Sequence, residues 1–151
     1  MKSKITFCHR KIIMHTGKGE EVRYYSDLMY VKYKAPYCWL YFWGGSTFRA
    51  EIPLTFLLEN LPEKPFVKCN RAEFINLCYY GGYNKNTLEI MIEDGTKIKM
   101  STRNIAKFKE KKANLKYFSP PCPNCSNCNK QSCRNYWLFS IETDMENKKT
   151  E

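Results

Sequence analysis

The sequence predicts a mainly β protein with two short helices. The hydrophobic pattern has mostly the period of strands, Gly-Gly and Asp-Gly pairs separate several of the runs, and only two segments carry helix signals. The length of 151 residues is typical of one domain and sufficient to bury a core. Aromatic residues make up 15% of the chain, a share too high for a disordered polypeptide.

The first strands are expected to include a hairpin. Residues 22–33 are rich in β-branched and aromatic residues, and the runs 38–43 and 47–52 flank the pair Gly44-Gly45. Because glycine tolerates a positive φ, this arrangement predicts a β-hairpin.

A helix and further strands follow. Residues 53–61 begin with proline, repeat leucine at helical spacing and end before a second proline, which predicts a helix of about two turns. Strands are expected at 66–68, 74–77 and 87–92, with a turn at Gly81-Gly82 between the last two.

The last elements are a hairpin and a helix. The Asp94-Gly95 pair is a strong hairpin signal and leads into a strand at 97–100 that alternates basic and apolar residues. Ser101 is a suitable N-cap for a helix over about 102–113.

The net charge of +10 lies on residues 1–118, because the charges of 119–151 cancel. A basic body attracts polyanions, usually nucleic acid, although solubility alone also explains such a charge. No apolar run approaches the about 20 residues that cross a bilayer, and no signal-peptide core follows the N-terminus. We therefore expect a cytoplasmic protein without a membrane partner.

Polar residues near position 70 suit contacts to DNA bases. Arginine can donate two hydrogen bonds to guanine and asparagine can pair with adenine, which makes Lys68, Asn70 and Arg71 candidates. The alternative is that these groups only cap strand ends and solvate loops.

A second group of candidates surrounds the start of the last helix. Ser101 and Arg103 open that helix, whose first N–H groups can hold a phosphate. Lys97 and Lys99 on the preceding strand would add attraction that does not depend on base sequence.

A spaced pattern is formed by Phe66, Lys68, Arg71, Ile75 and Asn76. It matches, in part, the signature F-x-[RK]-x-H-R-S-x-x-V-N of the LytTR family of bacterial DNA-binding domains, which the chain resembles over residues 20–113. The Asp-Gly hairpin and the Ser-x-Arg helix start follow in the family's order. Upstream, residues 27–31 resemble its D-I-x-Y-I strand. Asn70 replaces the usual His, and Ala72 and Glu73 replace Ser and an apolar residue.

The resemblance implies an elongated antiparallel β fold of small stacked sheets. It also implies a transcriptional regulator of the response-regulator output type that inserts loops into the major groove of double-stranded DNA, with a second copy on an adjacent direct repeat. By resemblance, the contacts are Lys68, Asn70, Arg71 and Arg103. Gly45, Ser46 and Arg49 are further candidates from the other end of the fold. Glu73 would repel phosphate, so it is expected to face elsewhere or to weaken binding.

Three segments are expected along the chain. Residues 1–118 form the LytTR-like domain, 119–142 a cysteine-rich segment and 143–151 a charged tail that is expected to be disordered. Only about 20 residues precede the resemblance, so no receiver domain for a phosphorylation input is expected.

The cysteine-rich segment is a candidate metal site. Its ligands would be Cys122, Cys125, Cys128 and Cys133, since four thiolates can bind zinc tetrahedrally. The pairs lie closer together than in most zinc sites, so an iron–sulfur cluster and a metal-free, redox-labile tail remain open. DNA binding itself requires no cofactor. The alternative function is a metal-binding or redox-responsive protein-interaction module, with one metal per chain and no preference between DNA sequences.

The remaining residues do not suggest catalysis. No paired carboxylates, Ser/His/Asp spacing or zinc-peptidase motif is present, so we expect no enzyme. Cys8, Cys38, Cys69 and Cys78 are expected to be buried, and a lowered pKa at Cys69, beside Lys68, is conceivable. A third hypothesis is single-stranded nucleic-acid binding by aromatic residues exposed on β surfaces.

Overall fold

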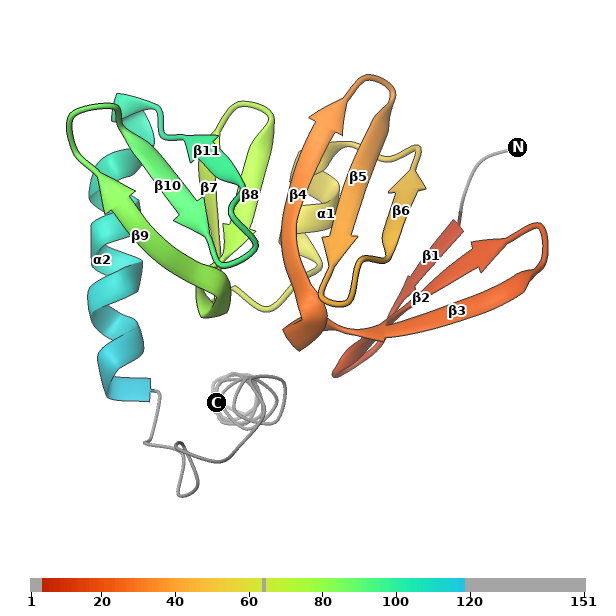
Figure 1. The fold of residues 1–151 in the computed structure, drawn as a ribbon. Helices are drawn as coiled ribbons and strands as arrows, with labels where there is room; N and C mark the ends of the chain where they lie inside the picture. Colours follow the sequence, from red (N-terminus) through yellow and green to blue (C-terminus); the bar gives the residue numbers. More distant parts are fainter. Residues whose placement is uncertain (1–3, 64, 119–151) are drawn as a thin grey trace.

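The computed structural model describes residues 4–63 and 65–118. The strands form three antiparallel sheets that follow one another along the molecule (Figure 1). The N-terminal sheet has the order β1-β2-β3, the central sheet β6-β5-β4-β8-β7 and the third sheet β11-β10-β9. Two α-helices accompany the sheets, so the prediction of a mainly β fold of small antiparallel sheets with two helices is confirmed.

The elements have the following bounds. The strands are β1 Lys4–Phe7, β2 Lys11–Thr16, β3 Gly19–Tyr24, β4 Leu28–Lys34, β5 Tyr37–Phe42, β6 Thr47–Ala50, β7 Phe66–Asn70, β8 Glu73–Asn76, β9 Tyr80–Asn84, β10 Glu89–Ile92 and β11 Lys97–Lys99. The α-helices are α1 Leu54–Glu59 and α2 Thr102–Phe118, and the short 3₁₀ helices are η1 Tyr25–Asp27 and η2 Leu77–Tyr79.

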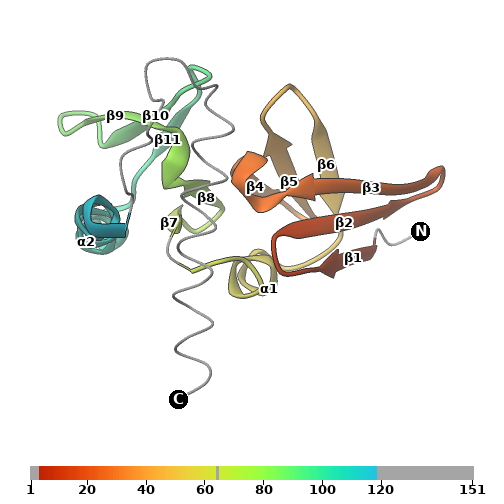
Figure 2. The same cartoon turned by 90° about the horizontal axis from the view of Figure 1, so that it is seen from below.

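Two hydrophobic cores cover the two faces of the central sheet. The first core contains Leu54 and Leu57 of α1, which lies under the sheet in Figure 2, together with Ile12 of the N-terminal sheet. The second core packs Ile75 of the central sheet with the third sheet and with Phe108 of α2. The third sheet and α2 are thus fixed to the β7–β8 half of the central sheet.

The two predicted hairpins are confirmed. The strands β5 and β6 pair in antiparallel register around Gly44 and Gly45, which have φ of +92° and +91°. The strands β10 and β11 pair in the same way around Gly95, with φ +94°. Each glycine occupies a backbone conformation that other residues rarely adopt.

The predicted turn at Gly81-Gly82 is wrong, because both residues lie within β9. A Cβ atom at Gly81 would lie 3.2 Å from the carbonyl oxygen of Met91 on β10, so the small residue permits a close strand approach. Gly82 has φ +144°, and the pairing of β9 with β10 shifts its register between Met91 and Ile92. The glycine pair therefore marks an irregularity inside a strand pair.

Two further features differ from the prediction. The helix α2 has 17 residues and continues past the expected end near 113, because no proline or glycine occurs before Pro120. Lys111 also fixes it, since its Nζ donates to the backbone oxygens of Glu63 and Phe66, at 2.7 Å each. The strands β1 and β2 were not predicted. No helix in the described ranges is long and apolar enough to cross a membrane.

Removal of the Asn76 side chain is expected to lower the stability of the fold strongly. Its fully buried side chain donates to the Leu28 carbonyl oxygen at 3.0 Å and accepts from the Cys78 N–H at 2.9 Å. In Asn76→Ala both partners stay buried without this bond, so we expect the free energy of unfolding to fall by about 2–4 kcal/mol. Denaturant unfolding measures it. The exposed Asn60 is the control, and Asn60→Ala should cost less than about 1 kcal/mol. Equal losses would contradict the role of burial.

Candidate nucleic-acid interface

Two turns meet at one end of the central sheet, and one of them carries the candidate residue Arg71. The β7–β8 turn contains Arg71 and Ala72, and the N–H of Tyr33 on β4 donates to the Ala72 carbonyl oxygen at 2.7 Å. Tyr33 lies next to the last residue of β4, where the β4–β5 turn begins. The β4–β5 and β7–β8 turns therefore lie side by side, at the upper end of the sheet in Figure 1.

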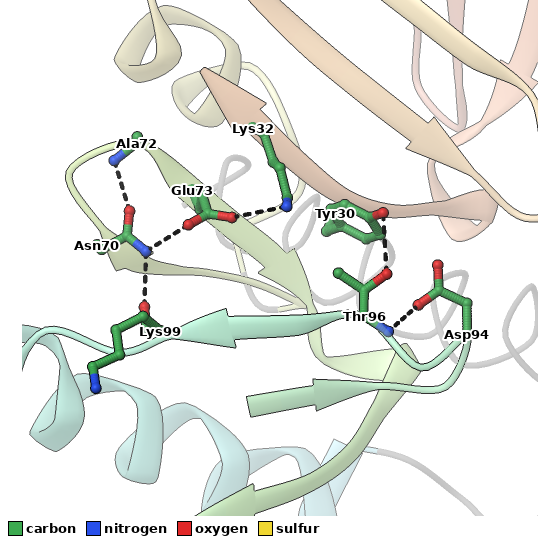
Figure 3. Close-up of polar contacts among 8 residues, drawn as sticks. All are labelled: Tyr30, Lys32, Asn70, Ala72, Glu73, Asp94, Thr96 and Lys99. Atoms are coloured by element: carbon green, nitrogen blue, oxygen red, sulfur yellow. Dashed lines mark hydrogen bonds and ion pairs between the residues drawn. The ribbon is translucent and has the colours of Figure 1, made fainter. Parts of the chain in front are cut away.

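Asn70 holds the β7–β8 turn with three hydrogen bonds (Figure 3). Its Oδ1 accepts from the Ala72 N–H at 2.8 Å, and its Nδ2 donates to Glu73 Oε1 at 2.9 Å and to the Lys99 carbonyl oxygen at 2.8 Å. The first two bonds close the turn, and the third joins it to β11 of the third sheet. Both amide hydrogens are used, so the role that the geometry gives Asn70 is positioning of the turn rather than an open base-reading edge.

The side chain of Glu73 lies against the central sheet rather than in solvent. Its carboxylate accepts from Asn70 and lies 3.6 Å from Lys32 Nζ, and its side chain is only 20% exposed. The ion pair neutralises its charge within the sheet. This placement agrees with the expectation that Glu73 faces elsewhere.

The start of α2 is fixed to the same turn region. The Ser101 N–H and the Asn104 Nδ2 both donate to the Cys69 carbonyl oxygen, at 2.9 and 3.2 Å, and Asn104 Nδ2 also donates to Ser101 Oγ at 2.7 Å. Because Cys69 lies two residues before Arg71, the first turn of α2 sits beside the β7–β8 turn. Arg71 and Arg103, both exposed, are thereby brought to the same end of the molecule.

The predicted lysines lie on other faces. Lys68 shares the face of β7 with Phe66 of the first core, away from Glu73. Lys97 and Lys99 are exposed on the outer face of the third sheet, as their alternation predicts. Lys99 Nζ donates to the Thr87 carbonyl oxygen at 2.7 Å and points away from Asn70 in Figure 3.

Arg49 was grouped with the Gly45-Ser46 turn in the sequence analysis, but the structure places it away from that turn. That turn lies at the far end of β5 from Arg71, and Ser46 Oγ accepts from Arg23 Nη2 at 3.3 Å. Arg49 pairs with Trp39, and its guanidinium carbon lies 4.6 Å from the centre of the Tyr37 ring. It therefore lies toward the β4–β5 turn, because strand β6 runs away from Ser46.

Two further basic residues near these turns, Lys32 and Lys34, were not among the candidate contacts predicted from the sequence. Both lie on β4, the second one exposed beside the β4–β5 turn. The signal was present as a basic residue at every second position of a strand, which places both on one face.

Cys69 is not an activated thiol. It is fully buried, and burial together with the nearby Glu73 charge raises its pKa to about 12, while burial raises the pKa of Cys38 to about 11. This contradicts a lowered pKa beside Lys68. In the described residues no group of three or more His, Cys, Asp or Glu side chains could hold a metal. Cys122, Cys125, Cys128 and Cys133 lie outside those residues.

Comparisons with known proteins agree with this architecture. The family described as LytTr DNA-binding domain matches residues 21–113. A solved structure, the LytTr DNA-binding domain of a methyl-accepting/DNA response regulator from Bacillus cereus, is similar with a TM-score of 0.59 and 17% identity, over 68% of this chain and 95% of that chain. A search of curated proteins gives no match.

The fold is thus that of a LytTr DNA-binding domain. The chain belongs to the LytTr DNA-binding domain family, and the resemblance inferred from residues 20–113 is confirmed. Membership favours a binding function over a catalytic one, and it makes the chain a DNA-binding regulator.

The reactivity of the buried thiols tests the packing beneath the candidate interface. At pH 8 the raised pKa values and burial keep Cys69 and Cys38 protonated and covered, so iodoacetamide should alkylate them at least about tenfold more slowly in the native protein than in urea. Mass spectrometry of the peptides measures this. Cys8, which is only half-buried, serves as the comparison and should react faster in the native state. Rapid native alkylation of Cys69 would contradict the packing.

Proposed function

We propose that the chain is a bacterial transcriptional regulator that recognises a specific double-stranded DNA sequence through the major groove. The β7–β8 turn and the first turn of α2 would enter the groove with Arg71 and Arg103. The observation that carries this proposal is their convergence at one end of a fold whose family binds DNA. Since its proposed partner is genomic DNA, we place the protein in the cytoplasm.

The geometry supports base reading by rigid elements. The Arg71 turn is closed by the side chain of Asn70, and the backbone that carries Arg103 is anchored to Cys69. Contacts held on such fixed backbones lose little conformational entropy on binding. Arginine can donate two parallel hydrogen bonds to the O6 and N7 of guanine, so each side chain could read one base pair.

The phosphate contacts are proposed to come from the surrounding cations. Ser101 and the first N–H groups of α2 lie beside Arg103, where they could hold a phosphate. Lys97, Lys99 and Lys68 lie on other faces and would act through the general positive field of a chain with net charge +10. We further propose that two copies bind adjacent direct repeats, each reading the same short sequence with the same turns.

Selection of bound duplexes from a random pool tests sequence recognition. At about 150 mM salt, purely electrostatic attraction is weakened, so enrichment reports base recognition. We expect an enriched motif repeated in the same orientation at a spacing near one helical turn, about 10 base pairs. An inverted arrangement would contradict the direct-repeat proposal, and a pool without enrichment would contradict sequence-specific binding.

Substitution of the two arginines tests the assigned contacts. Arg71→Ala and Arg103→Ala should each weaken binding to the selected duplex by about 1–3 kcal/mol and relax the base preference at one position. Fluorescence anisotropy with single-base variants of the duplex measures both effects. Lys18→Ala, on the exposed β2–β3 turn, is the matched control and should retain the preference at every position. An equal loss on all duplexes would show phosphate contact only.

A further inference from the structure

One side of the central sheet is covered over only half its width. On this side the third sheet lies against β7 and β8, where Val67, Cys69 and Ile75 belong to the second core. The opposite side is covered by α1. Among the described elements none lies over β5 and β6 on the first side, which faces the viewer in Figure 1.

Strand register identifies the side chains on this open half. The hydroxyl group of Tyr30 on β4 lies 3.3 Å from Thr96 Oγ1 in the turn between β10 and β11, so Tyr30 points to the side where the third sheet lies (Figure 3). Residues opposite one another in a ladder share a face. The pairings Tyr30 with Tyr41, Lys32 with Trp39, Lys34 with Tyr37 and Trp39 with Arg49 then define the aromatic–basic face: Lys32, Lys34, Tyr37, Trp39, Tyr41 and Arg49.

The rings of this face are held by their neighbours. Tyr41 stacks on Tyr30 with ring centres 4.5 Å apart and an angle of 15° between the planes. The Arg49 guanidinium carbon lies 4.6 Å from the centre of the Tyr37 ring and 5.9 Å from that of Trp39. All three β5 rings are half-buried, so they stand in fixed positions with part of each surface open.

The charge of the face is positive. Glu73 at its edge is paired with Lys32. Within residues 4–63 and 65–118, neither Lys34 nor Arg49 forms an ion pair, and both side chains are exposed. A partner therefore meets flat aromatic surfaces with cations beside them. An apolar peptide would have to desolvate these cations without compensation, whereas a polyanion would pair with them.

We infer that the aromatic–basic face binds single-stranded nucleic acid. Bases would stack on Tyr37, Trp39 and Tyr41, and phosphates would contact Lys34 and Arg49. Alternate residues of a strand lie about 6.8 Å apart, so the three rings form a row along which successive bases can bind. A duplex hides the faces of its bases, so stacking on these rings selects for unpaired bases.

This activity is separate from duplex recognition by Arg71 and Arg103. Those residues project from turns at the end of the sheet, whereas the rings lie along its face. The two can therefore be tested independently in the full chain.

Trp39 itself reports stacking. Trp43→Phe and Trp137→Phe leave it the only tryptophan of the chain, which has three. We titrate this protein with oligo(dT), oligo(U) and inorganic polyphosphate, each about 10 units long, within the range of site sizes for single-strand binding folds. The oligonucleotides should quench Trp39 fluorescence and polyphosphate should not. Comparison of oligo(dT) with oligo(U) distinguishes DNA from RNA as the preferred strand.

Substitutions on the face should weaken this binding. Tyr37→Leu should lower the affinity for a labelled oligonucleotide at least about fivefold, the lower range for loss of one base stack. Arg49→Gln should also lower this affinity and reduce its dependence on salt, because it removes one phosphate contact. Tyr24→Leu, at a tyrosine that is 50% exposed on β3 outside the face, is the matched control and should change nothing. Arg49→Gln keeps all three rings, so it remains informative if Tyr37→Leu lowers stability.

Three outcomes would overturn the inference. Polyphosphate could quench Trp39 as the oligonucleotides do, which would show charge attraction alone. Tyr37→Leu and Arg49→Gln could leave oligonucleotide affinity unchanged. The same variants could weaken the selected duplex as much as the single strand, which would make the face part of the duplex interface. Arg71→Ala is expected to retain oligonucleotide binding, so a failure of duplex recognition leaves this test intact.

Discussion

The structure depends on strand β4 being covered on both faces. Leu28 and Val31 belong to the first core, between the sheet and α1. Met29 and Tyr30 belong to the second core, which the sheet shares with the third sheet and α2. The same strand pairs with β5 on one edge and with β8 on the other. Two hairpins that are distant in the sequence are therefore joined into one sheet. The burial of apolar surface on both sides of β4 makes the two cores a single cooperative unit.

This arrangement brings the proposed DNA contacts to one end of the sheet. Because β4 runs antiparallel to both neighbours, its last residues meet the β4–β5 turn and the β7–β8 turn together. Asn70 then ties the second of these turns to the third sheet, and the Cys69 carbonyl oxygen receives the start of α2. Arg71 and Arg103 are exposed, yet the backbones beneath them are fixed by hydrogen bonds. Such preorganisation favours affinity, since fewer groups must be ordered on binding.

The elements that were predicted from the sequence are those with a local signal. Gly44-Gly45 and Asp94-Gly95 connect strands that pair with each other, so turn chemistry alone locates them. Gly81 and Gly82 were mistaken for a turn because their role depends on the Met91 carbonyl oxygen, a contact that sequence spacing does not reveal. The role of Asn70 was missed for the same reason. Its residue type suits a base as well as a backbone carbonyl, and only the fold brings Lys99 to it. Arg49 was grouped with Ser46 by proximity in sequence, although a strand carries them toward opposite ends of the sheet.

The N-terminal sheet bears on where this domain begins. The segment shared with the family starts at residue 21, inside β3, whereas Ile12 and Met14 of β2 are buried in the same core as Leu28 and Phe42. A protein cut at the family boundary would lose β1, β2 and part of β3, and would expose apolar surface that those strands cover. The segment defined by common descent is therefore shorter than the segment that folds as one body. Dissection of this chain into functional parts has to follow the packing rather than the alignment.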